Sequence, residues 1–199
     1  MEDLLERVIA IAQVFGRTGI PHSFGGAIAM GYYAPARPTY DIDINVYLRV
    51  DDAGRALDSL QELGVPEASD DQRAKIRRDG QTRLYWDDVP LDLFFWNLEF
   101  HASCCSRRRR YALLDHTIDI LSPEDLIVCK VAFGRDKDTR DVLQILDSMG
   151  ERLDLRYVLH WVEVIVGIDA APARQLTHAL AQRSLLPERR ARGDGPPAR

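Results

Sequence analysis

Two glycines and two aspartates near the start of the chain have the types and spacing needed for chemistry. Gly25 and Gly26 open an apolar segment of helical character, and Asp41 and Asp43 stand two apart at the head of an alternating strand. A Gly-Gly turn at a helix N-terminus exposes backbone N–H groups, which attract a polyphosphate. Residues two apart in a strand share a face, and neighbouring carboxylates repel each other unless a cation lies between them. Because hard oxygen ligands suit Mg²⁺ that also holds a phosphate, this segment predicts a nucleoside triphosphate and metal site.

A third carboxylate follows in a later strand. Asp92 alternates with Leu91 and Leu93 in the apolar stretch PLDLFFW. A buried carboxylate needs a partner or a metal, so Asp92 is the natural third metal ligand. The alternative is an edge strand on which Asp92 faces water.

The loop before Asp41 contributes two further candidates. Thr39 lies two residues before Asp41, so its hydroxyl could touch a phosphate, and Arg37 could pair with substrate phosphates or with surface carboxylates. Thr39 is also a candidate phosphorylation site, because added negative charge there would oppose triphosphate binding.

Taken together, these motifs resemble one family, the nucleotidyltransferase (polymerase beta-like) superfamily. The resemblance covers about residues 20–145 and rests on Gly25-Gly26, then Arg37-x-Thr39-x-Asp41-x-Asp43, then the strand carboxylate Asp92. Within the superfamily the chain is most similar to the minimal and AbiEii-type branch, in particular to MenT-like toxins of toxin–antitoxin pairs.

The resemblance implies a metal-dependent reaction. Two Mg²⁺ ions, with Mn²⁺ as an alternative, would be held by Asp41, Asp43 and Asp92. One ion would activate the attacking hydroxyl and the other would hold the triphosphate, since both oxygens of an in-line displacement need their charge neutralised. For MenT-like toxins it implies transfer of a pyrimidine nucleotide (CMP or UMP) to the 3′ end of tRNA, release of pyrophosphate, blocked translation and a cognate antitoxin.

A second cluster, GRDKDTRD at residues 134–141, matches a late helical segment of that branch. Lys137 is the first candidate to contact the triphosphate and act in catalysis, and Lys130, which falls among apolar residues, is the second. Asp138 and Asp141 are three apart on one helix face, and either could orient the lysine or the nucleotide. The alternative is a set of surface salt bridges with neighbouring arginines.

Two other functions remain open at this point. One is nucleotidyl transfer to a small molecule such as an aminoglycoside, which would need an acidic cavity for a cationic acceptor. The other is a protein-modifying (AMPylating) minimal nucleotidyltransferase antitoxin. The basic runs in the sequence favour an anionic acceptor instead, and they span residues 73–83, 107–110 and 183–199.

Composition excludes several classes of protein. The chain has 199 residues, 46% of them hydrophobic and 29% charged, which is typical of an ordinary globular domain. A net charge of −5 argues against nonspecific coating of nucleic acid. The absence of a long apolar run predicts no membrane span, and three cysteines without disulfide or zinc spacing favour a reduced cytoplasmic setting.

The order of elements predicts an α/β (α+β) fold. We expect a small mixed, mostly antiparallel sheet that carries the carboxylates, flanking helices and a C-terminal helical part. Strands are expected near residues 21–24, 41–48, 82–87, 90–96 and 117–121, and helices near 4–15, 27–33, 51–63, 123–133, 137–149, 154–166 and 171–184. This predicts a nucleotidyltransferase core at 1–150, a helical extension at 151–186 and a disordered tail at 187–199.

Overall fold

The computed structural model describes residues 2–35 and 38–187 of the chain, and these residues fall into two compact units. The first unit runs from Met1 to Leu126 and the second from Ile127 to Arg199. We describe each unit by itself. Arg37 and the predicted tail beyond residue 187 lie outside the described residues.

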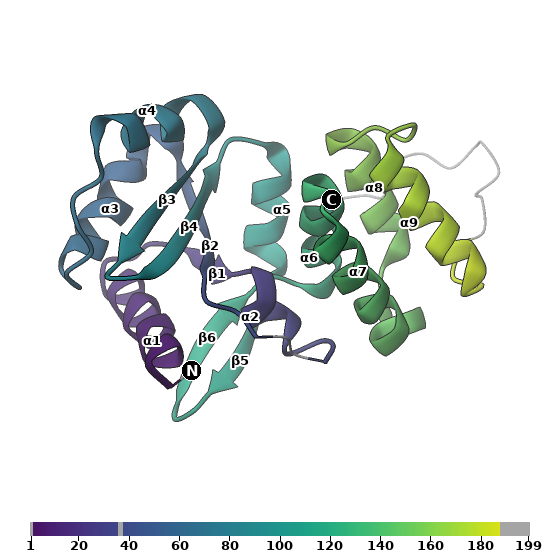
Figure 1. Cartoon of the computed structure of the whole chain (residues 1–199), viewed down its shortest axis with the longest axis horizontal. Coiled ribbons are helices and arrows are strands. Elements are labelled where there is room, and N and C mark those ends of the chain that lie inside the picture. The colour runs from purple at the N-terminus through teal and green to yellow at the C-terminus, as the bar shows by residue number, and fades with distance from the viewer. Residues whose placement is uncertain (1, 36–37, 188–199) are drawn as a thin grey trace. The chain divides into compact units, whose positions relative to one another are not determined.

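The first unit holds a sheet and the helices that cover it (Figure 1). Its strands are β1 (His22–Phe24), β2 (Ile42–Arg49), β3 (Gln81–Trp86), β4 (Val89–Trp96), β5 (Arg109–Leu113) and β6 (His116–Ile120). Its helices are α1 (Glu2–Arg17), α2 (Gly26–Met30), the 3₁₀ turn η1 (Val50–Asp52), α3 (Ala53–Gln61), α4 (Asp70–Asp79), α5 (Glu99–Arg107) and the start of α6 (Pro123–Phe133).

The sheet has the strand order β3-β4-β2-β1-β6-β5. The pairs β3–β4, β1–β2 and β5–β6 are antiparallel, whereas β2–β4 and β1–β6 are parallel. The structure therefore confirms the predicted mixed, mostly antiparallel sheet with flanking helices. Because β4 lies between β3 and β2, the alternative that Asp92 stands on an edge strand is wrong.

Alternation along β2 and β4 separates the core of the first unit from its polar face. Ile42, Ile44 and Val46 are fully buried, as are Leu91, Leu93 and Phe95. Residues between them in sequence point to the opposite face, because successive strand side chains alternate. Asp43 and Asp92 belong to that opposite face, so the hydrophobic pattern that fixes the strands also fixes where the carboxylates point.

The second unit is helical. It contains the rest of α6, then α7 (Asp136–Met149), the 3₁₀ turn η2 (Gly150–Arg152), α8 (Leu155–Ile165) and α9 (Ala171–Gln182). Helices α7 and α9 pack together through buried Val142, Ile145, Leu176 and Leu180. Gly134, at φ +64°, separates α6 from α7, as the interrupted helical pattern predicts. The predicted functional boundary at residue 150 stays a prediction.

Three elements escape the sequence pattern. Helices α4 and α5 and strand β5 were not expected, because their sequences read as charged runs or short polar segments. In α4 only Ile76 is buried, and in β5 half-buried and exposed residues alternate next to solvent. Among the described residues, no helix combines the length and apolar character needed to cross a bilayer.

Candidate active site

Two of the three predicted metal ligands are neighbours across the sheet. Asp43 of β2 and Asp92 of β4 are register partners in a parallel pair, so their side chains leave the same face side by side. Asp41 directly precedes the first residue of β2, and its Oδ1 accepts a hydrogen bond of 2.5 Å from the Thr39 hydroxyl. All three carboxylates are partly exposed, which leaves them accessible to a ligand.

The close approach of α2 to β2 depends on Gly26. This residue has φ +53°, and a Cβ added there would lie 1.7 Å from Oδ2 of Asp43. The glycine therefore makes room for the Asp43 carboxylate, a role that the sequence did not reveal. The neighbouring Gly25 donates its N–H to the carbonyl oxygen of Asp43 over 2.9 Å, which joins the turn to the start of β2.

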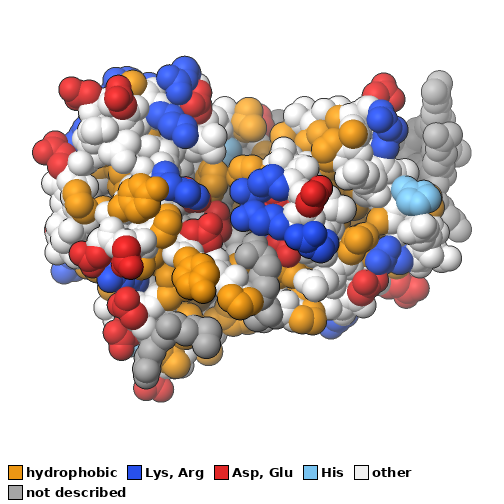
Figure 2. Space-filling model, viewed as in Figure 1, with side chains coloured by type: hydrophobic (Ala, Val, Ile, Leu, Met, Phe, Trp, Pro, Cys, Tyr) orange, Lys and Arg blue, Asp and Glu red, His pale blue; other side chains and the backbone are white. Residues whose placement is uncertain are grey.

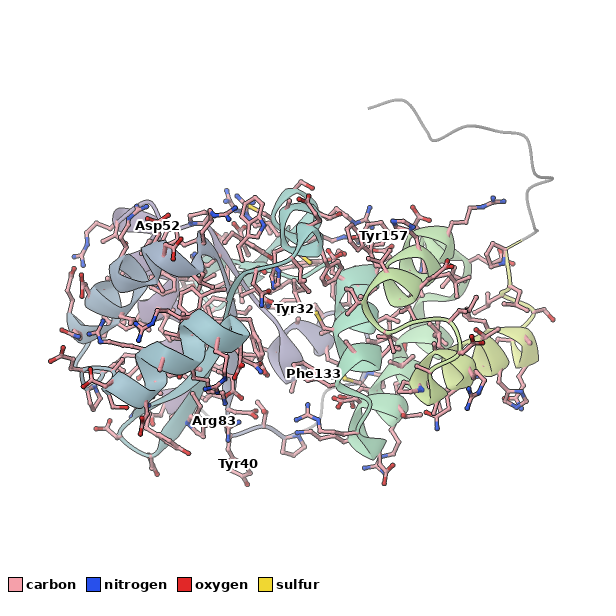
Figure 3. The ribbon with its side chains drawn as sticks, turned by 90° about the horizontal axis from the view of Figure 1, so that it is seen from above. Tyr32, Tyr40, Asp52, Arg83, Phe133 and Tyr157 are labelled. Atoms are coloured by element: carbon pink, nitrogen blue, oxygen red, sulfur yellow. The ribbon has the colours of Figure 1, made fainter. Side chains whose placement is uncertain are left out.

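Asp92 has a cationic partner on the adjacent strand. Arg83 of β3 faces Asp92 in the antiparallel register, and its Nε and Nη2 donate to the two carboxylate oxygens over 2.7 and 2.6 Å. The hydrogen bonds that Arg83 donates to Asp92 raise the pKa of Arg83. In Figure 3, Tyr40, which is 83% exposed, projects from the protein on the same side of the view as Arg83. Sequence reasoning counted Arg83 only as part of a basic run.

The donor set of this face fits a divalent ion in chemical type. Asp41, Asp43 and Asp92 supply only carboxylate oxygens, which are the ligands that Mg²⁺ and Mn²⁺ prefer. The register places two of them next to each other, and Gly26 keeps that space clear of a Cβ. Within residues 2–35 and 38–187, however, no three His, Cys, Asp or Glu side chains are already arranged around a metal position.

The second predicted cluster is a buried ion-pair network in the second unit. The ammonium of Lys130 donates to Oδ2 of Asp141 over 2.5 Å and lies 4.0 Å from Oδ1 of Asp138. Arg135 donates to Asp138 through Nε over 2.6 Å and through Nη2 over 3.2 Å. Lys130, Asp138 and Asp141 are all buried, whereas Lys137 is half-buried. The alternative of a purely surface salt-bridge set therefore fails for these two aspartates.

The arginine run at 107–110 is engaged within the first unit. Arg107 lies 3.0 Å and Arg109 3.6 Å from Oε2 of the buried Glu124. Arg108 and Arg110 both bind Asp119, over 3.2 and 2.9 Å. Figure 2 shows acidic and basic side chains intermingled over the region of α3 and α4 instead of a patch of one sign. The arginine run at 107–110 is thus compensated by carboxylates.

His22, the histidine nearest the site in sequence, has a structural environment. It lies opposite Val46 on the apolar side of β1–β2, with Phe15 in ring contact at 5.2 Å. Its Nδ1 is bonded to the carbonyl oxygen of Ile20 over 3.0 Å, and burial lowers the pKa of the imidazole.

Comparison with known proteins supports the fold. The sequence matches no family model, and it matches no curated protein. The solution structure of the antibiotic-resistance factor ANT(2'')-Ia aligns with a TM-score of 0.58 and 14% identity, over 92% of this chain and 97% of that one. A crystal structure of ANT(2'')-Ia in complex with adenylyl-2''-tobramycin aligns with a TM-score of 0.59 and 15% identity, over 80% and 97%. The chain therefore has the fold of nucleotidyltransferases, as the resemblance of its motifs implies.

Proposed function

We propose that the protein is a metal-dependent nucleotidyltransferase, which transfers a nucleotidyl group from a nucleoside triphosphate and releases pyrophosphate. The observation that carries this proposal is the register pairing of Asp43 with Asp92 on neighbouring parallel strands, with Gly26 making room for the Asp43 carboxylate. This pair of acidic side chains lies on the face opposite the hydrophobic core, so it does not contribute to the packing of the core. A nucleotidyltransferase fold that keeps the pair supports a site for chemistry.

In this proposal Asp41, Asp43 and Asp92 hold two Mg²⁺ ions, or Mn²⁺ in their place. The ions supply charge neutralisation for the attacking and leaving oxygens. Asp41 and Asp43 would share metal contacts, and Asp92 would serve the ion nearer the acceptor hydroxyl. Thr39 holds Asp41 through its hydrogen bond and orients it before the nucleotide arrives.

Nucleotide-binding roles are proposed for residues of each unit, taken by itself. Because the Gly25 N–H is used within the sheet, the backbone N–H of Gly26 is the better candidate for a phosphate contact. Lys137 is proposed to bind the triphosphate, since its side chain is partly accessible. The remaining proposed contacts are Gly25, Arg37, Thr39, Lys130, Asp138 and Asp141. Among these, buried Lys130 is proposed to hold the two aspartates in place.

As acceptor we propose the 3′ end of tRNA, with a pyrimidine nucleotide as donor and a cognate antitoxin as inhibitor. Support comes from exposed Lys75 and Arg77 on α4, the helix that packs against β3. These cations lie in the same unit as the carboxylates, and cations near a nucleic-acid backbone release bound counterions and so favour binding.

A small cationic acceptor is the second candidate. The specific observation in its favour is that all four arginines at 107–110 are paired with carboxylates, so this run adds little net positive charge. ANT(2'')-Ia, which has a similar fold, has been solved in complex with adenylyl-2''-tobramycin, which supports this candidate.

Label transfer tests the proposal and separates the acceptors. The protein is incubated with Mg²⁺ and each α-³²P-labelled nucleoside triphosphate, together with tRNA, an aminoglycoside mixture or total cell protein. The proposal expects label on tRNA that is lost in Asp43→Ala and retained in Asp119→Ala, a carboxylate that is also paired with arginine on the sheet. Label on an aminoglycoside or on protein would move the acceptor to that class. No label on any acceptor, with the protein folded, would contradict nucleotidyl transfer.

A further inference from the structure

The contact between Arg83 and Asp92 has a consequence for metal binding. Both guanidinium donors, Nε and Nη2, point at the two oxygens of one carboxylate, over 2.7 and 2.6 Å. This fork geometry is the strongest form of an arginine–carboxylate pair. The Asp92 side chain is only 19% exposed, so Arg83 covers much of the solvent side of the carboxylate that would otherwise receive an ion.

We propose that Arg83 acts as an intramolecular counter-ion of Asp92. Its guanidinium competes with the divalent metal for the Asp92 carboxylate and leaves this carboxylate when the nucleotide binds. The inference rests on the proposed function, because it needs a metal at Asp43 and Asp92. Without nucleotide, the guanidinium neutralises Asp92 beside Asp43 and relieves the repulsion between the two carboxylates. A divalent ion must then displace Arg83 from at least one oxygen before Asp92 can bind it.

The nucleotide supplies the reason for Arg83 to move. A triphosphate presents pairs of oxygens that can accept both donors of the guanidinium fork, as a carboxylate does, and it carries more charge, so it offers Arg83 an equivalent bidentate partner. Arg83 can reach a new partner because β3 is the outer strand of the sheet and the side chain is 47% exposed. Metal and nucleotide should consequently bind with positive coupling, and the coupling is the same whichever binds first.

The chain contains a matched pair that isolates this effect. Arg110 and Asp119 are register partners of the antiparallel pair β5–β6, just as Arg83 and Asp92 are in β3–β4. Arg110 also donates through Nε and Nη2 to the two oxygens, over 2.9 and 3.3 Å. Asp119 has no second aspartate as its register partner and keeps Arg108 at 3.2 Å, so removal of Arg110 changes net charge equally without opening a metal site.

The test is a Mn²⁺ titration followed by the electron paramagnetic resonance signal of free Mn²⁺, which does not depend on turnover. Wild type, Arg83→Gln and Arg110→Gln are compared with and without a non-hydrolysable α,β-methylene CTP. We expect Arg83→Gln to bind Mn²⁺ about two- to fivefold more tightly than wild type in the absence of nucleotide, the size of one half-exposed ion pair. The tightening of Mn²⁺ binding by nucleotide should be smaller in this variant, and Arg110→Gln should match wild type.

Three outcomes would overturn the inference. Equal Mn²⁺ affinity in Arg83→Gln and wild type would show that Arg83 does not compete. Tighter binding that persists in the double variant Arg83→Gln/Asp92→Asn would show that the gain comes from net charge and not from Asp92. Failure of every protein to bind Mn²⁺, with or without nucleotide, would contradict the proposed function as well. Should Arg83→Gln fold poorly by circular dichroism, Arg83→Lys keeps the charge without the fork and is expected to give an intermediate affinity.

Discussion

Replacement of Gly26 by alanine should disable the site with only a modest loss of stability. The new Cβ would start 1.7 Å from Oδ2 of Asp43, whereas real Cβ atoms essentially never approach within 3.0 Å. The contact must open by the difference, 3.0 minus 1.7, or 1.3 Å. A displacement of that size in a catalytic group costs about a hundredfold in rate. The left-handed backbone at φ +53° adds about 1–2 kcal/mol of strain to the folded state.

Gly19→Ala separates these two effects. Gly19 has φ +66°, close to that of Gly26, but a Cβ there would meet no atom within 4 Å. Both variants carry the positive-φ strain, and Gly26→Ala must also displace Asp43, so it should lose at least as much unfolding free energy as Gly19→Ala in urea titrations. Label transfer should fall about a hundredfold in Gly26→Ala and stay within about twofold of wild type in Gly19→Ala. Similar activities in the two variants would refute the role of Gly26 in placing Asp43.

Three further perturbations follow from the structure. Lys130→Met leaves the buried carboxylate of Asp141 without its ammonium partner and should lower the unfolding free energy, measured in urea, by about 3–5 kcal/mol. Lys137→Met should change it by no more than about 0.5 kcal/mol, and equal losses in the two variants would contradict the difference in burial. Burial lowers the pKa of His22 below its ordinary 6.5, so the unfolded chain binds more protons as the pH falls below 6.5, and stability decreases there. His22→Asn should flatten this decrease below pH 6.5, and an unchanged pH profile of the unfolding free energy would contradict it. Thr39→Glu should raise the KM for the triphosphate about tenfold or more, because its carboxylate repels the phosphates. The KM of Thr39→Val should stay within a few-fold of wild type, and equal effects of the two variants would show that charge at this position is irrelevant.

The carboxylate face was predictable because its signal is local. Period-2 alternation around Asp41, Asp43 and Asp92 shows which side of each strand is polar, and the buried Ile44 and Leu93 confirm it. Which strands become neighbours is not local information. That β2 and β4 lie side by side, with Asp43 level with Asp92, depends on the packing of residues about fifty positions apart in the chain.

The partner of Asp92 could have been found from the hairpin. Counting equal numbers of residues outward from the turn at Asp87-Asp88 pairs Trp86 with Val89 and Arg83 with Asp92, which is the observed register. The positive φ of Asp87, +55°, fits such a tight turn. The strands expected near 82–87 and 90–96 flank this turn, but the register between them was not followed to the charged pair.

The missed elements have little apolar signal. Helix α4 buries only Ile76, so its hydrophobic pattern is weak, and it is held at its start by a capping box in which Ser69 and Gln72 exchange hydrogen bonds. A serine followed by a glutamine three residues later was the available signal. The burial of Lys130 against Asp141 was harder to foresee, because it depends on how α6 meets α7 after the turn at Gly134.

The location of the metal tests the central claim most directly. Crystals grown with Mn²⁺ and α,β-methylene CTP would be measured at a wavelength where manganese scatters anomalously. The account predicts anomalous peaks against Asp43 and Asp92, with Asp41 also coordinated, and no such peaks in Asp43→Asn/Asp92→Asn crystals. Manganese bound elsewhere in wild type, with this face free of it while the nucleotide is present, would contradict the assignment of the site.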